Sequence, residues 1–198
     1  MWDDIKMITM GILDLQGDVE EHQIMTQKAF DEMQIEGKTK LVNVLEDIKD
    51  CDGLIISGGE SSTIGMHLER TGLLEYIRES KIPVLGTCAG LVLLSKDTKK
   101  DQILLGLIDM EVKRNGFGRQ RMSFETEIEF DGEKYPGIFI RAPYAENIAD
   151  NVEILSKYDG KVIGVKQDQY MAIAFHPELT ENTLIHRKFI EEVIECVE

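Results

Sequence analysis

One pattern recurs through the first hundred residues of this 198-residue chain: a short apolar run, a turn, and then apolar residues at helical spacing. The apolar runs predict buried strands at residues 7–15, 41–44, 53–57 and 83–87. Helices are predicted at 19–33, from the turn at 58–63 through residue 70, at 73–80 and at 88–95, and Asp18 is placed to cap the first of them. Because such strand–helix crossovers are right-handed, repeated units build a parallel sheet with helices on both faces.

The pattern changes at residue 108, where short runs separated by turns replace the strand–helix units. Strands are predicted at 108–113, 125–130, 138–142, 152–156, 162–165 and 171–175, and an amphipathic helix is predicted at 181–197. Some of these strands are expected to join the sheet antiparallel. The predicted fold class is therefore α/β: a three-layer, doubly wound, flavodoxin-like sheet, mixed but mostly parallel, with short antiparallel strands added.

Composition limits the kinds of function that the chain can have. Its length suits one domain over residues 1–198, and 42% hydrophobic residues with 30% charged residues are typical of a folded globular protein. The formal net charge of −15 argues against nucleic acid as a partner, because binding to phosphate backbones depends on clustered Lys and Arg.

The chain also gives no sign of a membrane segment or of a metal site. Its longest apolar stretches fall far short of the roughly 20 residues that cross a bilayer, and its first residues lack the order of a signal peptide. A cytoplasmic location is expected. Cys51, Cys88 and Cys196 are too few and too scattered for a disulfide framework or a zinc site, so we expect free thiols, no metal and no cofactor.

Cys88 lies in the segment Gly-Thr-Cys-Ala-Gly at residues 86–90, between a predicted strand and a predicted helix. The form G-x-C-x-G is the thiol counterpart of the sharp turn that exposes a nucleophilic serine. The start of a helix also favours a thiolate, because unpaired N–H groups and the helix dipole stabilise negative charge. The alternative is a small apolar residue in a turn. Cys51 and Cys196 have acidic neighbours, which oppose ionisation.

His176 stands at the end of the last predicted strand, followed by Pro177 and Glu178. A proline keeps the residue before it extended, and in extended chain residues i and i+2 point the same way, so Glu178 is expected to orient His176. A base held by a carboxylate is what a cysteine nucleophile requires. A surface histidine near a solvated glutamate is the alternative.

The segment Gly58-Gly59-Glu60-Ser61 follows the third predicted strand. Two glycines allow backbone N–H groups to approach a ligand closely, so Gly59 is expected to form an oxyanion hole with the amide of Ala89. A simple turn is the alternative. Phosphate binding is also open, although the sequence contains no GxxxxGK[ST] motif.

Taken together and in this order, GTCAGLVLL, SGGESST and FHPEL resemble the class I (triad) glutamine amidotransferases. LDLQGDVEEH near the start, RNGFGRQRMSFE at 114–125 and FIRAP at 139–143 narrow the resemblance to the glutaminase-subunit family of the two-component pyridoxal 5′-phosphate synthase. The resemblance extends from about residue 8 to 195. The last two segments are more specific than the cysteine and HPE motifs, which indicate only the superfamily.

The resemblance implies that Cys88 is the nucleophile of a triad with His176 and Glu178. It implies that a glutamine pocket is formed by Gly59, Glu60, Ser61, Arg114, Ile140 and Arg141. It also implies hydrolysis of L-glutamine to glutamate and ammonia. The ammonia would pass, within a hetero-oligomer, to a synthase subunit resembling a TIM barrel, which joins it to a pentose phosphate and a triose phosphate. Subunits of this family are active mainly when docked on the synthase.

The sequence departs from the family at Asp14, Ser62 and Gly116, where glycine, threonine and serine are usual, and none of these belongs to the triad. Two other function classes stay open: a cysteine hydrolase or peptidase on a similar fold, and a non-enzymatic binding domain. The remaining histidines, at positions 22, 67 and 186, fall on predicted helices, where solvated or packed rings are far commoner than catalytic ones. An interface role is one hypothesis for His22, because the LQGD turn lies near the partner surface in the family.

Overall fold

The computed structural model describes residues 7–117 and 123–197, and residues 118–122 of the RNGFGRQRMSFE segment lie outside this description. The strands are β1 (Ile8–Leu13), β2 (Gly37–Val42), β3 (Gly53–Ile56), β4 (Val84–Thr87), β5 (Ser95–Asp97), β6 (Ile108–Lys113), β7 (Ser123–Phe130), β8 (Glu133–Ile140), β9 (Tyr144–Glu146), β10 (Glu153–Tyr158), β11 (Lys161–Gln167) and β12 (Tyr170–Ile173). The helices are α1 (Val19–Met33), α2 (Leu45–Ile48), α3 (Ser61–Thr71), α4 (Leu73–Ser80), α5 (Ala89–Leu94), the 3₁₀ turn η1 (Pro177–Leu179) and α6 (Leu184–Val197).

The parallel half of the sheet has the order β2-β1-β3-β4-β12, which is the flavodoxin-like order. β1, β3, β4 and β12 are buried along their whole length, as expected for strands covered on both faces. The predicted α/β class and the parallel pairing of the first strands are confirmed. In such sheets, ligands bind beyond the carboxyl ends of the strands.

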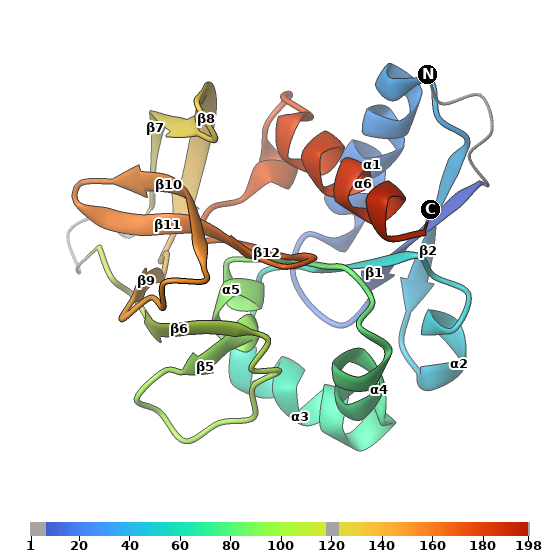
Figure 1. Cartoon of the computed structure of the whole chain (residues 1–198), viewed down its shortest axis with the longest axis horizontal. Coiled ribbons are helices and arrows are strands. Elements are labelled where there is room, and N and C mark those ends of the chain that lie inside the picture. The colour runs from blue at the N-terminus through green and yellow to red at the C-terminus, as the bar shows by residue number, and fades with distance from the viewer. Residues whose placement is uncertain (1–6, 118–122, 198) are drawn as a thin grey trace.

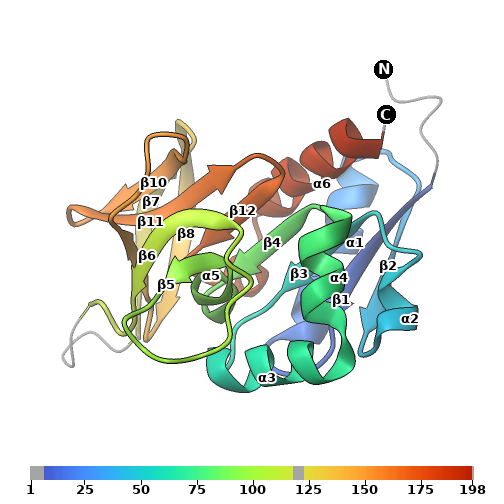
Figure 2. The same ribbon diagram turned by 60° about the horizontal axis from the view of Figure 1, so that its bottom comes forward.

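Helices cover both faces of this sheet (Figures 1 and 2). α1 and α6 lie side by side on one face, and α2, α3, α4 and α5 lie on the other. Each face encloses its own apolar cluster, one including Phe30 and Phe189 and the other including Leu68 and Leu93. The inner face of α1 is formed by residues at helical spacing, His22, Met25, Thr26, Ala29 and Phe30.

The second half of the chain extends the sheet with antiparallel pairs, as predicted. β11 pairs antiparallel with β12, β10 and β9, and β9 pairs antiparallel with β6. β7 and β8 form a separate hairpin, which stands at one end of the molecule in Figure 1. Its β8 strand brings Ile140 and the segment after it toward the parallel half, since His176 N–H donates to Ile138 O at 2.9 Å.

Several predicted boundaries are wrong. The second strand is Gly37–Val42 rather than 41–44, and residues 45–48 form the short helix α2. β5 and β9 were not predicted, and β8 starts five residues earlier than expected because the hairpin extends the ladder to Glu133. α6 begins at Leu184 rather than 181.

Asp18 occupies the N-cap position of α1 but makes no capping hydrogen bond with its side chain, so its predicted role is also wrong. Within residues 7–117 and 123–197, no helix has the length and apolar character needed to cross a membrane.

Candidate active site

The three predicted motifs meet at the carboxyl ends of β3, β4 and β12, which are neighbours in the sheet. A cavity of about 350 Å³ opens there. It is lined by Gly59, Glu60, Ser61, Cys88, Ala89, Val92, Arg114, Asn115, Ile140, Arg141, Pro143 and His176. All the residues that the sequence proposed for the site therefore face this cavity except Glu178, which is buried behind His176.

Cys88 sits at a backbone corner between β4 and α5. Its φ of 50° and ψ of −97° are unusual for a residue with a side chain, and strained residues of this kind concentrate at functional sites. The flanking glycines make the corner possible by close packing. A Cβ on Gly86 would lie 2.6 Å from the backbone of Gly90, and a Cβ on Gly90 would lie 2.5 Å from the carbonyl oxygen of Ile56.

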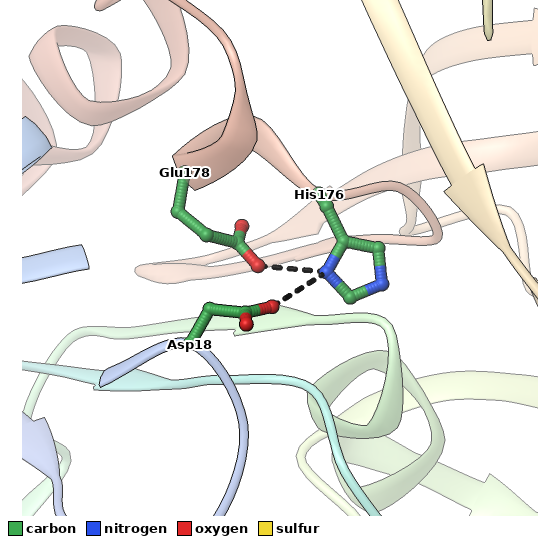
Figure 3. A group of neighbouring side chains, drawn as sticks. All are labelled: Asp18, His176 and Glu178. Carbon is green, nitrogen blue, oxygen red and sulfur yellow. Dashed lines mark hydrogen bonds and ion pairs between the residues drawn. The ribbon is translucent and has the colours of Figure 1, made fainter. Parts of the chain in front are cut away.

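His176 is extended, with φ of −107° and ψ of 91°, and its Nδ1 lies 2.7 Å from Oε1 of Glu178 (Figure 3). Pro177 does not continue the strand: it begins the 3₁₀ turn η1, and this turn rather than strand alternation returns Glu178 to the ring. The second ring nitrogen points away from the carboxylate (Figure 3).

Asp18 approaches the same ring nitrogen, with Oδ2 3.6 Å from Nδ1 (Figure 3). It comes from the loop between β1 and α1, and its side chain is 38% exposed, whereas that of Glu178 is fully buried. Ligand atoms of Asp18, His176 and Glu178 lie within 4.8 Å of one another. Nδ1 cannot bind a metal ion while its proton is donated to Glu178, so this arrangement suits two carboxylates that stabilise one imidazolium.

The electrostatics of the site favour a protonated His176. Burial lowers the pKa of this ring, but its interactions with Cys88 and with Glu178 outweigh burial and raise the pKa to about 10. Within the described part of the chain, no hydrogen bond that meets the usual geometric criteria reaches Nε2, although the Cys88 side chain lies near enough to raise the pKa of the ring. Burial raises the pKa of Glu178, against the hydrogen bond and the charge of His176, which lower it.

Opposite charges from two loops meet across the cavity. Nη2 of Arg114 lies 2.7 Å from Oε1 of Glu60, and this hydrogen bond lowers the pKa of the Glu60 carboxyl. Gln102 was not predicted as part of the site. Its Oε1 accepts hydrogen bonds from Ser61, Ser62 and Arg114. The sequence could not reveal this role, because Gln102 lies far along the chain from these partners.

The Gly58–Gly59 turn is held by the loop after β1. Oε1 of Gln16 accepts the backbone N–H of Glu60 at 2.9 Å, and the hydroxyl of Ser57 donates to the backbone oxygen of Gln16 at 2.6 Å. A Cβ on Gly58 would lie 2.9 Å from Cε1 of His176, so only glycine lets this turn pass the imidazole. Gln16 was also missed, although it belongs to the LDLQGD segment that marked the resemblance.

Three further lining residues, Val92, Asn115 and Pro143, adjoin the predicted motifs but were not proposed from the sequence. Asn115 has a φ of 49° and Arg141 a φ of 46°, so unusual backbone is present on two sides of the cavity besides Cys88. Val92, Asn115 and Pro143 could have been proposed from the sequence because they lie beside the predicted motifs.

Comparison of the sequence with known proteins gives a consistent assignment. A model of the SNO glutamine amidotransferase family matches residues 12–195. A pyridoxal 5′-phosphate synthase subunit PdxT from Methanosphaera stadtmanae is 74% identical over 191 residues, covering 96% of this chain and 100% of that protein. The subunit of the same name from Methanothermobacter thermautotrophicus is 53% identical over 192 residues, covering 97% and 100%.

Solved structures agree with this assignment. A crystal structure of a glutamine amidotransferase superposes with a TM-score of 0.83 at 37% identity, covering 93% of this chain and 98% of that chain. The structure of PurLQS from Thermotoga maritima has a TM-score of 0.65 at 14% identity and covers 98% and 100%, a likeness that shows the fold alone.

Proposed function

Because the chain belongs to the SNO glutamine amidotransferase family, we propose that it hydrolyses L-glutamine to glutamate and ammonia and delivers the ammonia to a pyridoxal 5′-phosphate synthase. The observation that carries this proposal is the meeting of a strained cysteine with a buried His–Glu pair at one cavity. Cys88 is the proposed nucleophile, His176 the acid and base, and Glu178 the group that orients His176.

The proposed resting state is a Cys88 thiolate beside a His176 imidazolium. The raised pKa of His176 supports this state, because the ring keeps its second proton at neutral pH. Glu178 accepts the Nδ1 proton, which leaves the Nε2 proton on the side of the ring away from the carboxylate (Figure 3). The pair thus holds a nucleophile and a proton donor ready together.

In the first half of the reaction, the thiolate attacks the carboxamide carbon of glutamine and the C=O electron pair moves to oxygen. Backbone N–H groups of Gly59 and Ala89 are proposed to stabilise this oxyanion. Both residues line the cavity, and the N–H of Ala89 belongs to the first turn of α5, where helix N–H groups lack intrahelical partners. The C–N bond then breaks, His176 gives its Nε2 proton to the leaving nitrogen, and ammonia and a thioester on Cys88 result.

In the second half, His176 Nε2 takes a proton from water and the hydroxide adds to the thioester carbon. The C–S bond breaks, the electron pair returns to sulfur, and glutamate leaves. The thiolate and imidazolium are then restored, so the sum is glutamine plus water giving glutamate plus ammonia. The reaction requires no redox partner, because no atom changes oxidation state.

The charges around the cavity suit a free amino acid. Glutamine carries an α-carboxylate and an α-ammonium group, and the cavity offers Arg114 and Arg141 as well as Glu60. Ser61 and the backbone at Ile140 complete the proposed pocket. A peptide or ester substrate would lack one or both of these free charges, which favours a glutaminase over a general cysteine hydrolase.

The proposed partner is the synthase subunit, which takes up ammonia released at this site. The relatives are named as subunits of pyridoxal 5′-phosphate synthase, and the chain matches them over their full length, which supports the same assembly for this chain. Docking would keep ammonia from escaping into solvent.

The decisive experiment measures release of glutamate by the chain alone and with a synthase shown to be active on ammonium salts. We expect turnover that rises on docking, and transfer of amide-labelled nitrogen from glutamine into pyridoxal 5′-phosphate. Cys88→Ala should abolish both, and the matched Cys51→Ala should not, since burial raises the pKa of Cys51 to about 11. Equally negligible glutaminase with and without the competent synthase would overturn the proposal.

A further inference from the structure

Two histidines lie in the core behind the triad. His22 on α1 and His186 on α6 are 0% and 1% exposed, and both belong to the buried faces of their helices. Core positions of this kind are normally apolar, because a buried polar group costs free energy unless it has partners. The burial of His22 also contradicts the hypothesis that it lies at a partner interface.

The two rings form a chain that ends at Glu178. Nε2 of His186 lies 3.2 Å from Nδ1 of His22, and Nε2 of His22 lies 3.3 Å from Oε2 of Glu178. Nε2 of His22 is also 3.3 Å from Oγ1 of Thr87, the residue before Cys88. His176 contacts the other carboxylate oxygen, Oε1. His22 and His176 therefore approach the carboxylate at its two different oxygens.

Oε2 of Glu178 lacks a well-aligned donor in this state. The side chain is completely buried, and no hydrogen bond of normal geometry reaches Oε2 from residues 7–117 and 123–197. An unsatisfied carboxylate oxygen is costly inside a protein, so a donor close to Oε2 is expected to stabilise it. Nε2 of His22 is the nitrogen placed beside this oxygen.

Burial determines the charge of the two rings, and the carboxylate determines their tautomers. Burial above all lowers the pKa of both His22 and His186, so each ring is neutral and carries one proton. A proton on Nε2 of His22 can be donated to Oγ1 of Thr87, with Oε2 of Glu178 also 3.3 Å from this nitrogen, and it leaves Nδ1 to accept the Nε2–H of His186. The other tautomer of His22 would place a lone pair against a carboxylate oxygen.

We propose that His22 is a positioning residue for the triad, which holds Oε2 of Glu178 through Nε2–H so that Oε1 keeps its hydrogen bond to His176. In this arrangement His186 donates its Nε2–H to Nδ1 of His22. The inference rests on the proposed function, since the orientation of Glu178 matters only if His176 transfers the protons. His22 acts through Glu178 and is not among the residues that line the cavity.

The first test compares glutaminase kinetics of the synthase complex containing wild-type chain, His22→Leu or His22→Gln. Loss of a hydrogen bond to a charged group predicts a kcat lower by roughly 10- to 100-fold in His22→Leu, with KM nearly unchanged because the cavity is intact. His22→Gln carries an amide N–H near the position of Nε2 and should recover most of kcat. The matched control is His67→Leu on α3. The ring of His67 lies outside the cavity lining and hydrogen-bonds to the backbone oxygen of Asn43, so this variant should leave kcat unchanged.

The second test needs no variant. Nitrogen chemical shifts of the ¹⁵N-labelled histidines in the wild-type chain report which ring nitrogen carries the proton. We expect neutral rings with the proton on Nε2 for both His22 and His186. A proton on Nδ1 of His22 would overturn the inference even if every variant failed to fold.

The outcomes separate this inference from the proposed function. A wild-type complex without glutaminase activity defeats the function, whatever the tautomers are. An active wild-type complex with wild-type kcat in a folded His22→Leu variant defeats the inference and leaves the function standing. Loss of thermal stability without loss of kcat would mean that His22 serves only the packing of α1 against α6, which also overturns the inference.

Discussion

At the scale of single residues, the Arg114–Glu60 pair holds two opposite charges of the kinds that the proposed substrate, a free amino acid, would require. Nη2 of Arg114 and Oε1 of Glu60 lie 2.7 Å apart, so the two side chains neutralise each other. Binding of glutamine would exchange this contact for two others, with the guanidinium on the α-carboxylate and the carboxylate on the α-ammonium group. The pair therefore keeps both groups from being unpaired before substrate arrives.

This exchange predicts the kinetic effect of removing the guanidinium. Arg114→Met should raise KM for glutamine by roughly 10- to 100-fold with a smaller change in kcat, because the lost contact is made equally in the ground state and the transition state. Steady-state glutaminase assays of the synthase complex measure both constants. Arg70→Met, an exposed arginine on α3, is the matched control and should leave KM unchanged. A normal KM in Arg114→Met would remove this residue from the pocket.

Sequence motifs located the residues that touch the cavity better than those that support it. Cys88, His176 and Glu178 can each be recognised from adjacent residues. Cys88 stands in the tight G-x-C-x-G turn, and His176 and Glu178 flank a proline. His22 and His186 carry no such local sign, because their burial arises only when α1 packs against α6. The side chain of Asp18 had a local reason to cap α1, but in the fold it faces His176 instead.

At the scale of elements, the corner between β4 and α5 depends on glycines packed in contact. Gly90→Ala should destabilise the protein by about 1–3 kcal/mol, because its Cβ would press on the carbonyl oxygen of Ile56 and push α5 away from β3. It should also lower kcat, since α5 begins directly after Cys88. Urea unfolding measures the first effect and the glutaminase assay the second.

The control for this substitution is Gly160→Asn, in the turn between β10 and β11. Gly160 has a φ of 72° with open space around a Cβ, and asparagine tolerates this conformation better than most residues. Its unfolding midpoint should stay near that of the wild type. An unchanged midpoint in Gly90→Ala would show that α5 can shift freely, against the packing described here.

Elements with long buried apolar runs were predictable, and edge or very short elements were not. β1, β3 and β4 are buried throughout, and their sequences, ITMGIL, GLII and VLGT, are mostly apolar. Among the described strands, β2 pairs only with β1. It contains two lysines, and such polar edge strands lack the apolar signal. β9 has only three residues, and it pairs with β11 on one side and with β6 on the other. Because this pairing depends on distant parts of the chain, the local sequence does not predict the strand.

At the scale of the whole molecule, the buried histidines connect the stability of the fold to the machinery of the site. His186 has a pKa lowered by burial to about 3, and burial also lowers the pKa of His22. The pKa of His176 is instead raised to about 10. Histidines in the unfolded chain titrate near 6.5. At acidic pH, protonation of His22 and His186 therefore favours the unfolded chain. Near neutral pH, the proton held by His176 favours the folded protein.

Whether stability rises or falls with pH depends on which state, folded or unfolded, binds more protons. Below about pH 6.5 the unfolded chain protonates His22 and His186 while the folded protein does not, so the free energy of unfolding falls as pH falls. Between about 6.5 and 10 only the folded protein holds the second proton of His176, so the stability from this group is complete below 6.5 and is lost as pH rises toward 10. The stability that these three histidines contribute is expected to be greatest near pH 6.5.

Replacement of one buried histidine isolates its contribution. Each such group adds a slope of up to about 1.4 kcal/mol per pH unit, so His186→Phe should flatten the pH dependence of unfolding between pH 6.5 and 5 by up to that amount. Urea unfolding of both proteins at several pH values measures the difference, and carboxyl groups, including Glu178 with its raised pKa, are common to both and cancel to first order. Parallel slopes for wild type and variant would mean that the folded protein protonates His186. The neutral chain from His186 through His22 to Glu178 would then be excluded at the pH where it was measured.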